Sequence, residues 1–325
     1  MSQKPLLVLH PGLPKCATST IQRLFTLDDN KIGSALGIGV IGKEFKPGNG
    51  YPEVTKLMYR QDNFVEEIHR QKFSYGSYFY SNEALPGSQI ALEAIGKKFI
   101  ITASIFTVRF PPLQSLSQFN YSGWLTATFD EFVNGKWTSP ISALERFVPQ
   151  IEKFRKASSR ILICPTERLG KPLEIRFIET CFGSVPEVAS QAPFSQGFTT
   201  NRSIGFAFAQ SLALEIRRRG VLVRPEDRSI LVKLAQNYPL PCELREIAPL
   251  GLSKDVLCRL QMVIPKYREF LIEYGLGDAE SDEVVRSASR DLDRAFDLRV
   301  STEKESKELA RHACQVLDLA HISKS

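Results

Sequence analysis

The stretch LVLHPGLPKCATSTIQ, residues 7–22, decides how the chain folds. An apolar run over residues 5–10 is short, continuous and ended by proline and glycine, which is typical of a buried parallel strand. Residues 18–27 carry apolar side chains at helical spacing and predict an amphipathic helix. A loop between such a strand and helix exposes backbone N–H groups at the positive end of the helix dipole. The segment therefore predicts an anion site.

Further strands and helices alternate behind this segment. Residues 99–109, FIITASIFTVR, are rich in β-branched side chains and predict the clearest strand. Two more strands are predicted over 75–81 and 160–164, and helices over 113–124 and 141–157. Such alternation indicates a parallel sheet with helices on both faces, a three-layer α/β/α fold.

Two segments give weaker signals. Residues 33–42 are apolar but interleaved with glycine, so they predict only a weak strand, and residues 53–71 predict a helix. Beyond residue 203 only helices are predicted. We expect a nucleotide-binding α/β core over 1–220 and a helical region over 221–325.

The first of these late helices, residues 203–219, ends in three arginines and Gly220. Cations favour the C-terminal end of a helix dipole, and glycine commonly caps it. This pattern predicts a helix end in preference to an anion site.

The composition is that of an ordinary globular protein. Of 325 residues, 43% are hydrophobic and 24% charged, which excludes a disordered chain. The net charge of +6 suits an enzyme with a polyanionic nucleotide ligand. Because such a surplus is common, we do not expect nucleic-acid binding from it.

Cysteine spacing and hydropathy bear on metal content and location. The six cysteines are scattered without a CxxC or Cys/His ligand spacing, so no metal site is expected. The apolar run near the N-terminus is too short for a signal-peptide core, and nowhere do eighteen apolar residues run together. We expect no membrane span and a cytoplasmic location.

The predicted loop contains groups that bind phosphate. Lys15 contributes an ammonium, and the first helical turn contributes the hydroxyls of Thr18, Ser19 and Thr20. The sequence Gly-Lys-Ser/Thr is absent, so this is not a Walker A loop. The alternative is a Ser/Thr-capped helix beside an incidental surface lysine.

A second candidate pair follows the clearest predicted strand. Arg109 stands at the strand's carboxyl end, where ligands bind in open α/β sheets, and Ser117 lies eight residues on. Together they could hold a phosphate through a charged fork and a hydroxyl. The alternative is a buried structural arginine and a helix-surface serine.

These motifs resemble the sulfotransferases that use 3'-phosphoadenosine 5'-phosphosulfate. PKCATST, residues 14–20, is similar to that family's Pro-Lys-x-Gly-Thr-Thr loop after the first strand. Arg109, Pro111 and Ser117 match its Arg-Asp-Pro segment with a serine eight residues after the arginine.

Three further segments extend the resemblance over about residues 5 to 220. They are ILICPTERL at 161–169, similar to a strand with a Tyr-Glu-Asp-Leu-like turn, Glu83 in YSNEAL, similar to Ser-Ser-Glu, and NRSIG at 201–205. The resemblance implies the family's P-loop NTPase-like fold and sulfuryl transfer without a metal.

The resemblance also implies roles for residues. Lys15 would act on the leaving phosphate, and Glu83 would take the acceptor's proton. The residues expected to bind the donor are Lys15, Cys16, Ala17, Thr18, Ser19, Thr20, Arg109 and Ser117.

The chain departs from the family pattern at several positions. Ala17 replaces the usual glycine and Cys16 the usual Thr or Ser, while Phe110 replaces the aspartate of Arg-Asp-Pro. The turn over 165–168 lacks the family's tyrosine and aspartate. These departures bear on activity more than on fold.

The base and the acceptor stay open at the level of sequence. Glu83 could equally be a solvated carboxylate at a strand end, and His10 could pack or form hydrogen bonds there or act as the base. The acceptor could be a glycan, a lipid-linked saccharide or a small molecule such as an alcohol, held by loops over 46–51 and 121–137. Aromatic side chains there could stack on it or simply pack: Tyr51, Tyr121, Trp124 and Trp137.

Two other functions remain as alternatives. A kinase-like enzyme on a related phosphate-loop fold would need a Walker A lysine and a carboxylate for magnesium. A non-catalytic module that binds the nucleotide but has lost the chemistry is the second.

Overall fold

The structure is a computed structural model. It describes residues 4–13, 15–26, 31–41, 66, 68, 72–83, 85–136, 138–167, 169–191, 204–245, 247–249, 254–296 and 301–320. The chain forms two compact units. Unit 1 contains Met1–Phe110, Glu145–Thr200 and Arg268–Val284, and unit 2 contains Pro111–Leu144, Asn201–Tyr267 and Val285–Ser325.

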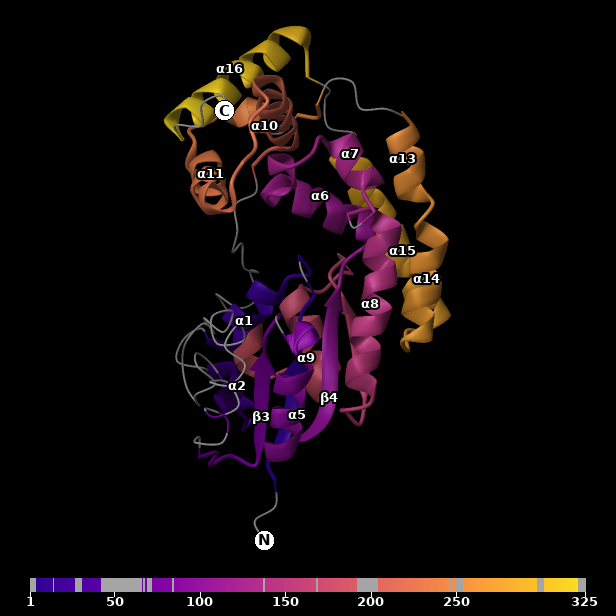
Figure 1. The fold of residues 1–325 in the computed structure, drawn as a ribbon. Coiled ribbons are helices and arrows are strands. Elements are labelled where there is room, and N and C mark those ends of the chain that lie inside the picture. The colour runs from indigo at the N-terminus through magenta and orange to yellow at the C-terminus, as the bar shows by residue number, and fades with distance from the viewer. Residues whose placement is uncertain are drawn as a thin grey trace. The chain divides into compact units, whose positions relative to one another are not determined.

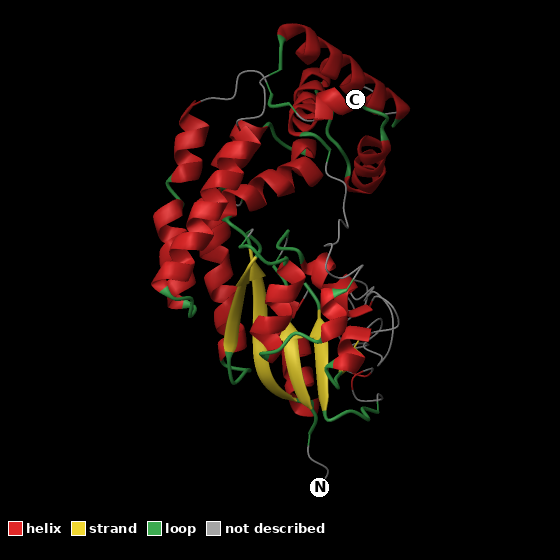
Figure 2. Cartoon of the chain, turned by 180° about the vertical axis from the view of Figure 1, so that it is seen from behind, coloured by secondary structure: helices red, strands yellow, loops and turns green. Residues whose placement is uncertain are grey.

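Unit 1 is built on a five-stranded parallel sheet in the order β2-β3-β1-β4-β5 (Figures 1 and 2). The strands are β1 Leu6–His10, β2 Gly39–Ile41, β3 Ser77–Ser81, β4 Ile100–Val108 and β5 Ile161–Pro165. The predicted parallel α/β fold is confirmed, and so are the strands expected over 5–10, 75–81, 99–109 and 160–164.

Helices cover both faces of the sheet because successive strand residues point to opposite sides. Ile105 of β4 belongs to a core shared with α1 Thr18–Thr26, α2 Lys31–Ala35 and α9 Leu173–Phe182. The next residue, Phe106, meets Phe154 of α8 Pro140–Arg155 edge-on at 5.4 Å between ring centroids. α8 in turn lies beside α5 Gln89–Lys98, with Lys153 donating to the carbonyl of Pro86.

Of the two weaker predictions, the strand is confirmed only in part, and the helix lies mostly outside the described residues. The strand expected over 33–42 is only the three residues of β2, and α2 occupies its start. The helix expected over 53–71 lies outside the described residues except for Glu66 and Ile68, which are helical. The remaining short helices of unit 1 are η3 Leu85–Gly87 and η5 Glu187–Ser190.

Unit 2 contains the predicted C-terminal helices together with the segment after β4. Its elements are α6 Pro111–Tyr121, η4 Gly123–Leu125, α7 Phe129–Asn134, α10 Phe206–Arg219, α11 Pro225–Asn237, α12 Cys242–Arg245, α13 Lys254–Gln261 and α16 Glu303–Leu319. Residues of both units contribute to α8, α14 Ile264–Glu273 and α15 Asp278–Phe296. The division at residue 220 stays a prediction, since these units follow other bounds.

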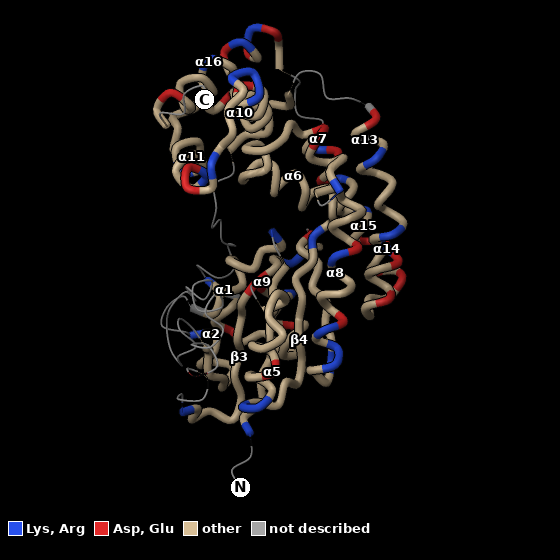
Figure 3. Tube along the Cα trace, viewed as in Figure 1, with Lys and Arg blue, Asp and Glu red and all other residues tan. Residues whose placement is uncertain are grey.

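Contacts between aromatic rings and ion pairs of arginines join the helices of unit 2. Phe129 of α7 meets Phe206 of α10 at 4.7 Å between ring centroids. The arginines that close α10 (Figure 3) are paired with carboxylates: Arg219 binds Glu215 of its own helix and Asp318 of α16. Gly220 follows with a left-handed φ of 64°. The predicted helix end is confirmed, and its cations serve packing within the unit.

Candidate functional site

In unit 1, the carboxyl ends of four parallel strands, β1, β3, β4 and β5, lie along the same side of the sheet. We call this side the carboxyl edge. His10 ends β1 opposite Ser81 of β3, and Val108 ends β4 opposite Pro165 of β5. Open α/β sheets bind their ligands outside this edge. The chain segments that leave it carry three of the predicted site residues: Lys15, Glu83 and Arg109.

The loop between β1 and α1 has an unusual backbone. Gly12 has a φ of 53°, and Lys15 and Ala17 each have a φ of 61°. A residue with a Cβ in this left-handed region costs roughly 1–2 kcal/mol, and such strain concentrates at ligand-binding sites. Left-handed residues in a turn also direct successive N–H groups into anion-binding concavities.

Gly12 is required here for a second reason, the close approach of α1. A Cβ at this position would lie 2.6 Å from Oγ1 and 2.7 Å from Cγ2 of Thr18. The Thr18 hydroxyl donates to the carbonyl of Leu13 at 3.4 Å and is buried. Thr18 therefore ties the loop to the helix, and its hydroxyl is already used.

The first turn of α1 leaves backbone donors at the loop. The N–H groups of Thr20 and Ile21 both donate to the carbonyl of Ala17, at 3.0 and 3.2 Å. A helix has no internal acceptor for its first four N–H groups, and among the described residues none accepts the N–H of Thr18 or Ser19. The side chains of Ser19 and Thr20 are half-buried.

The Glu83 carboxylate acts on the pKa of Lys15. Burial lowers the pKa of the half-buried Lys15 ammonium, and the Glu83 carboxylate acts against that shift by raising it. The net direction is downward, so the folded protein favours the charged lysine less than water does. An anion bound beside Lys15 would favour the charged form.

Cys16 connects the loop to the end of β4. Its thiol is fully buried, and burial raises its pKa to about 12, while the charge of Arg109 and a hydrogen bond from the Arg109 backbone act in the opposite direction. Cys16 is therefore a neutral packing residue between loop and strand. Arg109 itself is half-buried.

Glu167 stands at the same edge, in the 161–169 segment, but the sequence predicted no role for it. Its buried carboxylate accepts a hydrogen bond from the backbone N–H of Phe110 at 2.5 Å. Arg176 of α9 fixes the turn by donating to the carbonyls of Pro165 and Glu167, both at 2.6 Å. Its sequence signals were its place just after a predicted strand and within the segment over 161–169 that is similar to a strand with a Tyr-Glu-Asp-Leu-like turn.

His10 bridges three strands and is fully buried. Its Nδ1 lies 2.8 Å from the Ser81 hydroxyl and its Nε2 lies 3.0 Å from the Thr107 hydroxyl. Phe177 packs edge-on at 5.0 Å between ring centroids. Burial lowers the pKa of His10 to about 3, so the ring is neutral at physiological pH. Both nitrogens are occupied, and His10 has no exposed atom with which to reach an acceptor.

The other predicted residues fall elsewhere. Ser117 lies half-buried in α6 of unit 2, and its pairing with Arg109 stays a prediction. Trp124 is only 1% exposed, so it packs in the core of unit 2 and offers no stacking face. Tyr121 borders a pocket of that unit. The predicted residues at 51 and 137, and the NRS of NRSIG at 201–203, lie outside the described residues.

A scan against models of protein families and a search of curated proteins both found no match to the chain.

Within the described residues, none of the helices combines the length and apolar character needed to cross a bilayer. The six cysteines are free thiols.

Proposed function

We propose that this protein transfers a sulfuryl group from 3'-phosphoadenosine 5'-phosphosulfate to a hydroxyl or amine of an acceptor. The proposal rests on the resemblance of the segments around Lys15, Glu83 and Arg109 to sulfotransferase motifs. All three residues leave the carboxyl edge of one sheet in unit 1. That arrangement is the one in which α/β folds present ligand-binding groups.

The observation that carries the proposal is the partly buried environment of the Lys15 ammonium, which lowers its pKa. Its ammonium is half-buried, with a pKa lowered by burial and only partly restored by Glu83, at a loop that also offers the N–H groups of Thr18 and Ser19. A cation and backbone donors that are already in place gain more from a doubly charged phosphate than from neutral ligands.

Each group has a defined part in the proposed reaction. The acceptor oxygen or nitrogen attacks sulfur, its proton passes to Glu83, and the bond from sulfur to the bridging phosphate oxygen breaks. Negative charge develops on that oxygen, where Lys15 and the amides of α1 would stabilise it. The products are the sulfated acceptor and adenosine 3',5'-bisphosphate.

At Phe110 the family's aspartate after the arginine is missing, and the backbone N–H of Phe110 donates to the Glu167 carboxylate, which follows β5. The methyl group of Ala17 is a different matter, because it occupies a left-handed position that glycine would take without strain. We expect the Ala17 methyl group to weaken binding of the donor.

Glu83→Gln tests the proposed base. The amide keeps the shape of the side chain but cannot take a proton, so turnover of labelled donor over a panel of acceptors should fall by roughly a hundredfold. Binding of adenosine 3',5'-bisphosphate should stay within about threefold, because losing this carboxylate alters only the field at Lys15.

Glu93→Gln, the same change at an exposed position of α5, is the matched control and should alter neither quantity. Equal turnover by the wild type and Glu83→Gln would remove Glu83 from the mechanism. Nucleotide binding without transfer to any acceptor, in the wild type as well, would instead favour a non-catalytic module.

A further inference from the structure

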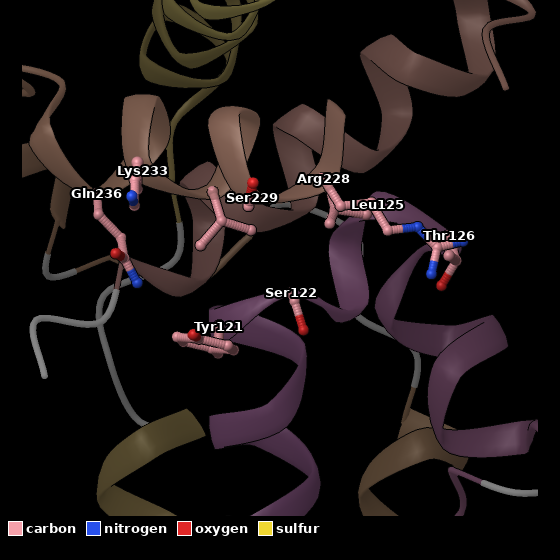
Figure 4. A pocket seen from close by; sticks show the side chains of 9 residues that line it. Tyr121, Ser122, Leu125, Thr126, Arg228, Ser229, Lys233 and Gln236 are labelled. Carbon is pink, nitrogen blue, oxygen red and sulfur yellow. The ribbon is translucent and has the colours of Figure 1, made fainter. Parts of the chain in front are cut away.

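Unit 2 contains a pocket of about 390 Å³ (Figure 4) between α11 and the turn that joins α6 to η4. One wall is a stripe of α11 whose residues recur at helical spacing: Arg228, Ser229, Val232, Lys233 and Gln236. The other wall comes from α6 and η4. A pocket of this size accommodates a small ligand.

Two cations on α11 give the pocket its charge. Arg228 and Lys233 are five residues apart, which separates their attachment points by about 7.5 Å along the helix axis. Neither forms an ion pair or hydrogen bond with a described residue, and none of the residues that line the pocket is acidic. Arg224, one turn earlier, is by contrast paired with Asp227 at 2.9 Å.

The remaining lining combines polar side chains with apolar surface from Leu125 and Val232. Tyr121 is 38% exposed, and Figure 4 shows its ring across the pocket from Lys233 and Gln236. The hydroxyls of Ser122 and Ser229 and the Gln236 amide supply donors and acceptors. Burying these groups without hydrogen-bond partners is costly, so a ligand that brings its own hydroxyl groups is favoured. A polyhydroxylated ring satisfies them and offers C–H groups to the tyrosine face.

We propose that this pocket binds an acidic saccharide, meaning a sugar that bears a carboxylate or a sulfate. Arg228 lies at one end of the pocket and Lys233 at the other, and both attract the anionic ligand (Figure 4). Tyr121 packs against the sugar ring, and the hydroxyls and amide bind its hydroxyl groups. The inference goes beyond the transfer activity and does not require it, because saccharide binding can be measured without the nucleotide donor.

Calorimetry on the full chain tests the proposal with defined probes. Lactose sulfate and cellobiouronic acid, both acidic disaccharides, should bind at least about tenfold more tightly than lactose or inorganic sulfate. Arg228→Gln and Lys233→Gln should each weaken lactose sulfate about fivefold or more, since each removes a charged hydrogen-bond donor. Tyr121→Ala should weaken both acidic disaccharides but leave inorganic sulfate unchanged.

Arg224→Gln removes the same charge from the N-cap of α11, outside the pocket, and is the matched control. Circular dichroism of each variant establishes that it is folded. Saturable binding of an acidic disaccharide that depends on Arg228 and Lys233 but not on Arg224 supports the proposal. Binding of neither acidic disaccharide, or equal affinity for lactose, would overturn it. Equal affinity for inorganic sulfate would reassign the pocket to simple anions and also overturn it.

Discussion

His10 should make unit 1 sensitive to mild acid. The folded protein holds its ring neutral, with a pKa lowered by burial from 6.5 to about 3. The unfolded chain binds a proton as soon as the pH falls below about 6.5. The free energy of unfolding therefore decreases as the pH falls from about 6.5 toward 3, and this contribution stops changing below that.

The size of the effect follows from these two pKa values. A histidine that protonates only when unfolded lowers the free energy of unfolding by about 2 kcal/mol at pH 5 and by about 0.2 kcal/mol at pH 7. Carboxylates also contribute to acid sensitivity, so the comparison must be made between variants. His10→Gln keeps a polar group between Ser81 and Thr107 but cannot titrate.

Urea unfolding followed by circular dichroism, at pH 7 and pH 5, measures the difference. The wild type should lose about 2 kcal/mol more between the two pH values than His10→Gln does. His312→Gln, at a histidine of unit 2 that is only half-buried, controls for the loss of a ring as such. Nuclear magnetic resonance titration of the wild type gives an independent value, and a His10 ring that protonates near pH 6 would refute the reasoning.

Other predictions concern the loop before α1. Gly12→Ala should destabilise the protein by about 2 kcal/mol or more, because its Cβ would lie 2.6 Å from Thr18 Oγ1. The control is Gly96→Ala in α5, whose Cβ would meet no atom within 4 Å, and this change should be neutral or stabilising. The midpoints of urea unfolding distinguish the two variants. Ala17→Gly should raise stability by about 0.5–1 kcal/mol in the same assay, since φ is 61° there, and a clear loss would show that the position is not strained. Binding of adenosine 3',5'-bisphosphate should weaken as the pH rises through the pKa of Lys15, at a lower pH than an ordinary lysine with a pKa of 10.5 would give, and a binding profile flat up to pH 10.5 would contradict this.

The fold was predictable because its signals are local. The continuous apolar run before His10 and the β-branched run before Arg109 indicate buried parallel strands whatever the rest of the chain does. The three residues of β2 were hard to predict because so short a strand depends on pairing with β3, and Gly39 is needed there to admit the Tyr78 ring.

The site was predictable only in part. The loop with Lys15 carries its own signature, but the buried role of His10 depends on Thr107 and Ser81, which come from other strands. Glu167 was missed for the same reason, since its partner is a backbone N–H at Phe110. Burial removed Trp124 from the candidate acceptor walls, because sequence alone does not show which aromatic side chains face the core.

The most direct test of the account is calorimetric titration of wild-type protein and Lys15→Ala with adenosine 3',5'-bisphosphate, alongside ATP with magnesium. The account predicts that the wild type binds the bisphosphate in preference to ATP, and that Lys15→Ala loses about tenfold or more in affinity while remaining folded. Lys97→Ala, at an exposed lysine of α5, should bind as the wild type does. Preference for ATP with magnesium would favour a kinase-like enzyme, and bisphosphate affinity unchanged in Lys15→Ala would contradict the central role given to this lysine.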